Sequence, residues 1–315
     1  MTPRFASAAA ALCMVAVLAA GVALAADRLP IIDAHSQAED AIALERILEL
    51  MNEAGVSRTI LAARRKTTIH DMVQFARAYP DRITAAVRSK GGAYQDKTPQ
   101  AFRQFLAKQL KFKEFTAMAE TLIYHAEKTN RQGKTIAPQV AFPPRHEKVT
   151  IALKAALDKG WPFIPHIEFA SLGGAERDRY MREFERMLRA YPRHPFLLIH
   201  MGQLGPDDVE RLIAAHPNIH FITAHTTPVT LSRSREPWTA MFEGRSLAPP
   251  WRALILTHPD RFVLGFDNVW ANHWETFYLP QVRLWREALA ELPDAVAHAV
   301  AHGNAERLWG LPPAR

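Results

Sequence analysis

The feature that most constrains the fold of this chain is a repeated alternation of short apolar segments with longer amphipathic segments. The run 56–63 (VSRTILAA) precedes the helical pattern 69–80, and the run 82–88 (RITAAVR) precedes the helical pattern 98–112. Strands that alternate with helices of this length favour parallel pairing through right-handed crossovers. Eight apolar runs of this kind follow one another, at 28–33, 56–63, 82–88, 115–125, 161–169, 195–202, 218–225 and 261–267.

Eight strand–helix units predict a closed (β/α)8 barrel, the TIM barrel, whose usual size is about 250 residues. Without its first 25 residues the chain of 315 keeps 290, which suits one such domain at 26–315. The alternative is an open doubly wound sheet, which normally has a Gly-rich phosphate-binding turn after its first strand. No such turn follows 28–33. The segment 128–146 is predicted to be a loop.

The N-terminal residues are typical of a Sec-type signal peptide. Arg4 is the only charged side chain before Asp27, residues 12–24 form an apolar core, and Ala23-Leu24-Ala25 supplies a cleavage site. Residues 1–25 are therefore predicted to be removed, which places the mature protein in the periplasm or outside the cell. The alternative is an uncleaved membrane anchor, since the uncharged stretch nearly reaches spanning length. After cleavage we expect no stable membrane association.

Composition excludes several classes of chemistry. Cys13 is the only cysteine and leaves with the signal peptide, so the mature chain has no disulfide, thiolate nucleophile or thiolate ligand. The net charge of +7 becomes +6 without Arg4. Basic residues are scattered among acidic ones, so nucleic acid is not expected as a partner. The positive balance suits a small anionic substrate or the outer surface of a membrane equally well, and a homo-oligomer is compatible with the sequence.

Polar side chains follow almost every predicted strand, and a barrel carries its active site at the carboxyl ends of its strands. They are Asp33, His35 and Gln37; Arg64 and Arg65; Arg88 and Lys90; Glu120 and His125; His166 and Glu168; His200; His225; and Asp267. A period of two predicts that the first three share one face. Each residue also has a structural interpretation, such as a hydrogen-bonded histidine or a turn cap. Together they predict one axial pocket.

Five motifs carry a family resemblance. They are IIDAHSQ, PHIEF, LLIHMGQLGPDDVERLIAAHPNIHFI, PDRFVLGFD and HGNAERLWGL. The chain resembles the amidohydrolase superfamily of metal-dependent TIM-barrel hydrolases, in the branch that includes aminocarboxymuconate-semialdehyde decarboxylase. The resemblance covers essentially the whole mature chain and implies an enzyme.

The resemblance implies roles for four residues. His35 and His166 would be neutral imidazole ligands of one divalent metal, and Asp267 would bind the metal or take a proton from its water. His200 would be a second-site ligand or the base that orients the water. Zn²⁺ suits these ligands best, with Mn²⁺ and Fe²⁺ as alternatives.

Gln37 departs from the family pattern. The family's His-x-His becomes His35-Ser36-Gln37, which replaces an imidazole by an amide that binds transition metals poorly. Glu120 could join His166 and His200 around one metal, as a strand-four acid does in binuclear relatives, or could line the barrel paired with Arg64 or Arg88. Some relatives, such as a pyrone-dicarboxylate lactonase, hydrolyse without metal, and this alternative stays open.

The sequence thus favours an exported hydrolase that acts on a small anionic ester, lactone or amide. Asp267 is predicted to be the general base, with His200 as its partner in activating water. Arg64, Arg88 and Glu168 are the predicted substrate contacts. Two alternatives remain: a metal-dependent decarboxylase on the same barrel, and a catalytically degenerate barrel that binds a solute.

Overall fold

A computed structural model of the chain describes residues 29–130, 132–231 and 240–314. The predicted signal peptide, residues 1–25, lies outside these ranges. Within them, no helix combines the length and the apolar character that crossing a membrane requires.

Parallel strands form the ring of a (β/α)8 barrel, as the sequence predicts. The barrel strands are β1 (Ile31–Ala38), β2 (Val56–Ala63), β3 (Ile83–Val87), β4 (Phe115–Met118) continued by β5 (Thr121–His125), β9 (Pro165–Ile167), β10 (Phe196–Ile199), β11 (Ile219–Ile222) and β14 (Phe262–Val263). The backbone N–H of Leu197 donates to Phe163 (2.8 Å) and joins β10 to the strand before it. The N–H of Ala34 donates to Leu264 (3.0 Å) and joins β1 to β14.

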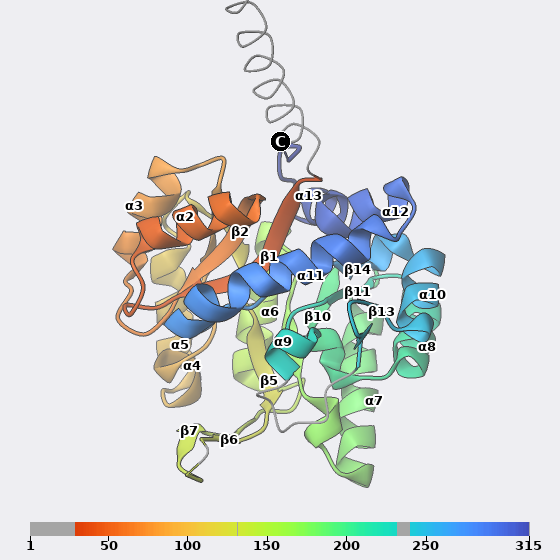
Figure 1. Cartoon of the computed structure of the whole chain (residues 1–315). Coiled ribbons are helices and arrows are strands. Elements are labelled where there is room, and N and C mark those ends of the chain that lie inside the picture. Colours follow the sequence, from red (N-terminus) through yellow and green to blue (C-terminus); the bar gives the residue numbers. More distant parts are fainter. Residues whose placement is uncertain (1–28, 131, 232–239, 315) are drawn as a thin grey trace, which may run out of the picture.

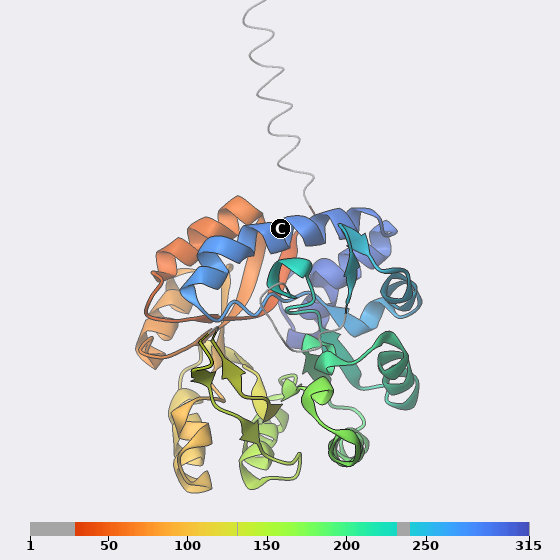
Figure 2. The same ribbon diagram turned by 60° about the horizontal axis from the view of Figure 1, so that its bottom comes forward.

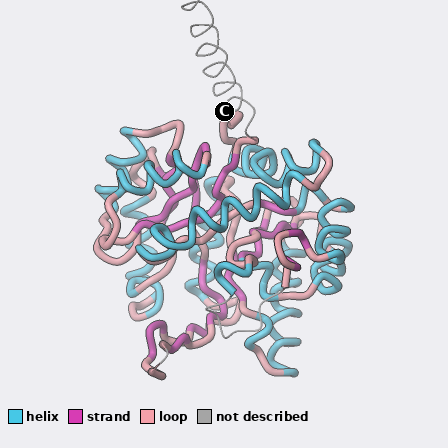
Figure 3. Tube along the Cα trace, viewed as in Figure 1, coloured by secondary structure: helices cyan, strands magenta, loops and turns pink. Residues whose placement is uncertain are grey.

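Helices cover the outside of the ring, and Figure 2 shows them arranged around the strands. They are α2 (Leu44–Ala54), α3 (Ile69–Ala78), α4 (Gly92–Gln95), α5 (Pro99–Gln109), α6 (Glu147–Lys159), α7 (Gly174–Ala190), α8 (Pro206–Ala215), α9 (Pro228–Leu231), α10 (Pro249–Thr257), α11 (Leu279–Ala290), α12 (Asp294–His298) and α13 (Asn304–Trp309). Short helical segments are η1 (Phe169–Ser171), η2 (His200–Gln203), η3 (Pro259–Arg261), η4 (His273–Tyr278) and η5 (Ala299–Gly303). The tube in Figure 3 shows strands inside and helices outside.

Local sequence explains several helix boundaries. Thr68 and Asp71 form a capping box at the start of α3, so two backbone N–H groups without helical partners are satisfied. Thr98 accepts a hydrogen bond from Ala101, and Pro99 occupies the first turn of α5. Gly160 ends α6 in the left-handed conformation.

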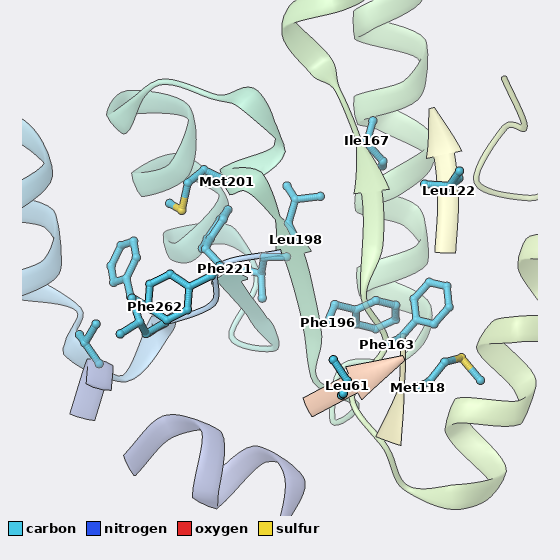
Figure 4. Close-up of a cluster of buried hydrophobic side chains, with 14 of the residues drawn as sticks. Leu61, Met118, Leu122, Phe163, Ile167, Phe196, Leu198, Met201, Phe221 and Phe262 are labelled. Carbon is cyan, nitrogen blue, oxygen red and sulfur yellow. The ribbon is translucent and has the colours of Figure 1, made fainter. Parts of the chain in front are cut away.

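The apolar side chains form two clusters, one on each face of the strands, because successive side chains of a strand point to opposite faces. The larger cluster lies between strands and helices and includes Phe163, Phe196 and Phe221, which Figure 4 labels. The smaller cluster fills the barrel itself, and Trp309 of α13 packs against it. On three strands its members change from a large to a small side chain towards the carboxyl end: Ile32 to Ala34, Ile60 to Ala62, and Ile222 to Ala224 just beyond β11. Small side chains near the carboxyl ends leave room there for a site.

The first strand departs from the regular alternation that the sequence predicts. Its register with β2 shifts between Asp33 and Ser36. Ala34 lies in the barrel interior two residues after Ile32, as regular alternation requires. Because of the shift the next residue, His35, also faces the axis, 3.4 Å from Asp267. The carboxylate of Asp33 instead accepts hydrogen bonds from the Ser36 hydroxyl (2.5 Å) and the backbone N–H of Phe266 (2.9 Å). The prediction that Asp33 shares a face with His35 and Gln37 is wrong because of this bulge.

Two other regions differ from their predicted form. The predicted fourth strand, 115–125, is interrupted at Ala119 and Glu120, whose carbonyl oxygens lie 2.8 and 2.7 Å from Ser89 Oγ. The predicted loop 128–146 contains three short strands, β6 (Lys128–Thr129), β7 (Thr135–Ala137) and β8 (Val140–Ala141). A further hairpin, β12 (Phe242–Glu243) and β13 (Ser246–Leu247), lies in the connection after β11. Figure 1 shows β6 and β7 at the bottom, at the end of the barrel opposite α13.

His220 on β11 is a histidine that the barrel buries without a hydrogen-bond partner for Nδ1 among the described residues. Burial lowers its pKa to about 4, and the nearby charges of Arg261 and Arg307 act in the same direction. The ordinary pKa is 6.5. The unfolded chain therefore binds this proton more tightly than the folded chain does, and folding stability is lost as the pH falls from 6.5 to 4.

Between pH 7 and pH 5 the unfolding free energy of the wild type should fall by about 2 kcal/mol more than that of the His220→Gln variant. The reason is that the variant lacks the histidine whose pKa the fold depresses. Urea unfolding at the two pH values measures this difference. The exposed His70→Gln is the control and should behave as the wild type. Equal losses in the His220→Gln variant and the wild type would contradict the assignment.

Candidate active site

A cavity of about 350 Å³ lies at the carboxyl ends of the barrel strands. Each strand exit contributes to its wall, and residues 136–138 at the end of the β6–β7 hairpin line it as well. The polar lining residues are Gln37, Arg64, Arg65, Arg88, Lys90, Gln95, Glu120, His125, Lys128, His166, Glu168, His200, His225, Asp267, Trp270 and His273. His35 is fully buried beneath them.

Backbone strain is concentrated at this end of the barrel. Among the described residues, the non-glycine positions with positive φ are Arg65, His200, Met201, Gln203, His225 and Asp267. All of them follow β2, β10, β11 or β14, and four of them line the cavity. Each such conformation costs on the order of 1–3 kcal/mol and persists only where the surroundings enforce it. Strain that gathers at strand exits is typical of a functional site.

A left-handed turn positions His200. The four residues of η2 have φ values between 55° and 64°. Gly202 is required in this turn for a second reason, since a Cβ atom there would lie 2.5 Å from Cδ2 of Leu198. The turn holds the Nδ1 atom of His200 3.1 Å from the carbonyl oxygen of Ala224. A carbonyl only accepts, so Nδ1 carries the proton and Nε2 faces Asp267.

The carboxylate of Asp267 lies at the centre of the site and uses its two oxygens differently. Oδ1 accepts a hydrogen bond from Nε2 of Gln37 (2.8 Å) and lies 3.4 Å from Nε2 of His35. Oδ2 lies 3.5 Å from Nε2 of His200 and 3.9 Å from Nδ1 of His225. The carboxylate therefore contacts residues that come from β1, β10 and β11.

A chain of alternating charges forms the opposite wall. Nδ1 of His166 lies 2.6 Å from Glu120, and its Nε2 lies 3.2 Å from Glu168. The ammonium group of Lys90 contacts Glu120, and that of Lys128 lies 2.8 Å from Glu168. Burial alone lowers the pKa of His166, but the two carboxylates outweigh burial and raise it to about 9. Each buried carboxylate is thus flanked by two cationic groups.

The arginines at the mouth of the cavity differ in the groups that their guanidinium groups contact. Arg64 and Arg65 each lie 3.1 Å from the same oxygen of Glu39, and both guanidinium groups lie over the ring of Trp270. Arg88 donates to two backbone carbonyls, those of Lys90 (3.2 Å) and Arg65 (3.4 Å). No carboxylate of the described residues forms an ion pair with Arg88. Its charge is therefore available to an anion in the cavity.

Four groups of side chains offer three ligand atoms that lie within 4.8 Å of one another. They are His35, Glu120 and Asp267; Glu120, His166 and His200; His125, His166 and Glu168; and His200, His225 and Asp267. The donor set fits a divalent metal, since imidazole nitrogens and carboxylate oxygens are ligands of Zn²⁺. His35 adds an independent sign, because neither of its buried ring nitrogens has a hydrogen-bond partner among the described residues.

The structure brings the predicted site residues together. Gln37, Arg64, Arg88, Glu120, His166, Glu168, His200 and Asp267 line the cavity, with His35 below it. Glu120 pairs with Lys90 and His166, whereas the structural interpretation had paired it with an arginine. Lys128 was missed because it lies in a predicted loop, and no sequence signal marks its approach to Glu168. The catalytic, metal-binding and substrate-binding roles themselves stay predictions.

Fold and site together define a TIM-barrel enzyme whose polar residues converge at the carboxyl ends of the strands. A family model described as Amidohydrolase matches residues 125–311. This is more than half of the chain, and the chain belongs to the amidohydrolase family. No curated protein matches it.

Solved structures share the fold. An uncharacterized TIM-barrel protein from Bordetella bronchiseptica has a TM-score of 0.60 at 14% identity, over 90% of this chain and 99% of that one. A 5-carboxyvanillate decarboxylase from Sphingomonas paucimobilis has a TM-score of 0.54 at 14% identity, over 90% and 100%. A zinc-bound amidohydrolase from Burkholderia multivorans has a TM-score of 0.53 at 15% identity, over 90% and 99%.

We expect Gly202→Ala to lower the unfolding free energy by about 2–4 kcal/mol, because it adds a clash with Leu198 to the cost of a positive φ. Urea unfolding measures the change. Gly160→Ala is the matched control, since Gly160 also has a positive φ but no atom within 4 Å of an added Cβ. Its expected loss is about 1 kcal/mol. Equal losses in the two variants would show that the packing around η2 does not constrain His200.

Proposed function

We propose that the enzyme is an exported hydrolase that attacks the carbonyl carbon of a small anionic ester, lactone or amide. The observation that carries the proposal is the position of Asp267, whose carboxylate faces the cavity between His35 and His200. Its Oδ2 and the Nε2 atom of His200 are two acceptors that face each other at 3.5 Å. A water molecule that donates to both would be held with its oxygen lone pairs towards the cavity.

Within this proposal Asp267 accepts the proton of the attacking water and His200 orients that water. The hydrogen bond from Gln37 to Oδ1 fixes the carboxylate, so that Oδ2 is the oxygen presented to His200. A positioned general base contributes about 10²–10⁴-fold to the rate. Gln37 is thus a positioning residue, and its amide suits that task because it donates to the carboxylate.

His35, His166 and Asp267 are the predicted ligands of a divalent metal, and Zn²⁺ is the metal these ligands suit best. The groups whose ligand atoms lie close enough together join His35 and Asp267 to Glu120, and place His166 in other groups. Among the described residues neither ring nitrogen of His35 has a hydrogen-bond partner, which supports a metal beside His35. A bound metal would supply a Lewis acid and lower the pKa of a water bound to it. Both nitrogens of His166 face carboxylates, which raise its pKa to about 9 and favour the cationic ring, so this residue supports the metal-free alternative.

The charges around the cavity support an anionic substrate. Glu39 is shared by Arg64 and Arg65, Glu120 pairs with Lys90, and Glu168 pairs with Lys128. Arg88 has no carboxylate partner among the described residues and lines the cavity. A substrate carboxylate beside Arg88 would complete the pairing.

A decarboxylase is the second candidate. The similar fold of a carboxyvanillate decarboxylase and the cationic wall that would hold a carboxylate both support it. Product analysis separates the two reactions, since a decarboxylase releases CO₂ without consuming water. The export component of the proposal rests on residues 1–25 alone, and no partner beyond a small molecule is proposed.

We expect Asp267→Asn to reduce turnover at least about 10²-fold while the protein stays folded, because the proton acceptor is lost and the amide is nearly isosteric. Purified protein is screened against anionic esters, lactones and amides, and kcat is compared by product formation. Asp208→Asn is the control, since this carboxylate pairs with Arg177 on the surface. Full activity of the Asp267→Asn variant would overturn the mechanism.

Arg88→Met is expected to raise KM for an anionic substrate by about 10–100-fold, as a charged hydrogen bond is worth about 1.5–3 kcal/mol. A neutral analogue of the same substrate should show little change in KM. Arg77→Met, a surface arginine paired with Glu114, is the matched control. An equal effect of Arg88→Met on both substrates would mean that Arg88 supports the structure and does not recognise charge.

A further inference from the structure

A second cavity, of about 930 Å³, lies at the amino ends of the barrel strands. Its wall includes the amino-terminal parts of β2, β3 and β4, the end of α6 and residues 307–312. Figure 1 shows α13, to which residues 307–309 belong, at the end of the barrel away from β6 and β7. No residue lines both this cavity and the candidate active site. The volume is within the range of small-molecule sites, about 300–1,000 Å³.

The lining of this second cavity is cationic. Five cationic side chains and two carboxylates contribute to it, a net charge of +3: Arg58, Arg77, Lys113, Lys159 and Arg307 against Asp81 and Glu114. Arg77 and Glu114 form an ion pair with each other (2.7 Å). Among the described residues, none of the other four cations forms an ion pair with a carboxylate. A phosphate group, with up to two negative charges, compensates this excess better than one carboxylate does.

Arg58 on β2 provides a rigid anchor in this lining. Only 7% of its surface is exposed. Its Nη1 atom donates to the carbonyl oxygen of Pro80 (2.9 Å) and to Oγ1 of Thr84 (3.1 Å). Its Nε and Nη2 atoms donate to no group of the described residues. A guanidinium group presents its N–H groups as a planar fork that matches phosphate, so Nε and Nη2 suit two oxygens of one phosphate.

A purely structural role would leave most of this guanidinium group without a partner. The two hydrogen bonds from Nη1 connect β2 to β3 and to the turn before it, and they need neither Nε nor Nη2. Burial lowers the pKa of Arg58, against the opposing effect of the charge of Asp81. A buried charge is costly unless it is paired and hydrogen-bonded. An anion beside Nε and Nη2 supplies that pairing.

Apolar surface lies next to the cations. Trp161, which is half-buried, lines the cavity, and Nζ of Lys159 lies 5.8 Å from the centre of its ring. Leu308, Trp309 and Leu311 line it as well and pack against the apolar cluster inside the barrel. Aromatic and aliphatic side chains with a few polar groups among them are typical of small-molecule sites. The combination favours a ligand that joins an anionic group to an apolar body.

We propose that this cavity binds a phosphate group attached to an apolar body. Arg58 is the anchor, and the three exposed cations of the lining supply further charge. Two sources have this chemistry, a soluble phosphate ester and the headgroup of an anionic lipid. The proposal goes beyond the proposed function, because the cavity shares no residue with the candidate active site.

The test is a titration of the purified protein with phenyl phosphate and with inorganic phosphate, followed by NMR of the indole N–H groups. The chain has seven tryptophans, and the Trp161→Phe and Trp270→Phe variants assign the two signals that matter. Phenyl phosphate should shift the Trp161 signal saturably, at lower concentration than inorganic phosphate, which has no apolar body. Trp270 lines the candidate active site and reports separately on binding there.

Charge removal tests the lining. Lys113→Gln combined with Lys159→Gln should weaken the binding reported by Trp161 by about 10-fold. Lys111→Gln combined with Lys154→Gln is the matched control, because it removes the same charge from exposed lysines outside the lining. The control should bind as the wild type does.

Removal of the anchor should have the larger effect. Arg58→Met is expected to weaken binding by about 10–100-fold, as a hydrogen bond to a charged group is lost. Circular dichroism checks its folding. Should this variant fail to fold, the two lysine variants still decide the proposal, since they change exposed side chains only.

Vesicles distinguish the two sources of phosphate. Sedimentation with vesicles that contain phosphatidylglycerol, but not with phosphatidylcholine alone, would identify a lipid headgroup if the Lys113→Gln/Lys159→Gln variant loses it. Binding of phenyl phosphate without sedimentation would identify a soluble ester. The proposal is overturned if Trp161 does not respond and no vesicles bind, or if the two lysine variants bind equally well. None of these results depends on turnover, so a failure of the hydrolase proposal is recognised separately.

Discussion

Asp267 joins the closure of the barrel to the chemistry of the site. Its backbone N–H donates to His35 (2.7 Å) and helps to connect the last strand to the first, while its carbonyl oxygen accepts from His225 (2.9 Å). The φ of 46° that these bonds impose turns the carboxylate towards the axis. The same residue therefore adopts a strained backbone conformation and helps to close the ring. Its carboxylate contacts the side chains of Gln37 and His200.

Charge compensation explains how so many ionisable groups remain buried together. An unpaired buried carboxylate is costly, and removal of one partner of a buried pair typically destabilises by about 3–5 kcal/mol. Here Glu120 and Glu168 share His166 and each contact one lysine. With His166 cationic, the wall has three positive groups for two carboxylates, so each of these carboxylates has cationic partners without a ligand. The opposite wall, around Asp267, holds imidazoles in place of lysines, which is why the activation of water is proposed there.

Much of the fold and the membership of the site could be predicted from the sequence, because both follow from strand periodicity and from the rule that barrel sites lie at carboxyl ends. His200, His225 and Asp267 were placed correctly at the cavity on this basis. The bulge at Asp33 could not be predicted, since it depends on a hydrogen bond from the backbone N–H of Phe266, which follows β14 and lies 233 residues away in the chain. The pairing of Lys128 with Glu168 depends on a hairpin that has no apolar periodicity.

Gln37, which stands where the family resemblance implies a histidine, shows how the side chain at one position changes the role of its neighbours in the barrel. A histidine at this position would present a lone pair or a single N–H, whereas the amide presents an NH₂ group that donates to Oδ1 of Asp267. Oδ1 therefore accepts a hydrogen bond on the side of β1, and Oδ2 faces the histidines that follow β10 and β11. Oδ2 is therefore the oxygen available beside His200, and the water that we propose as the nucleophile belongs on the side of the sixth strand.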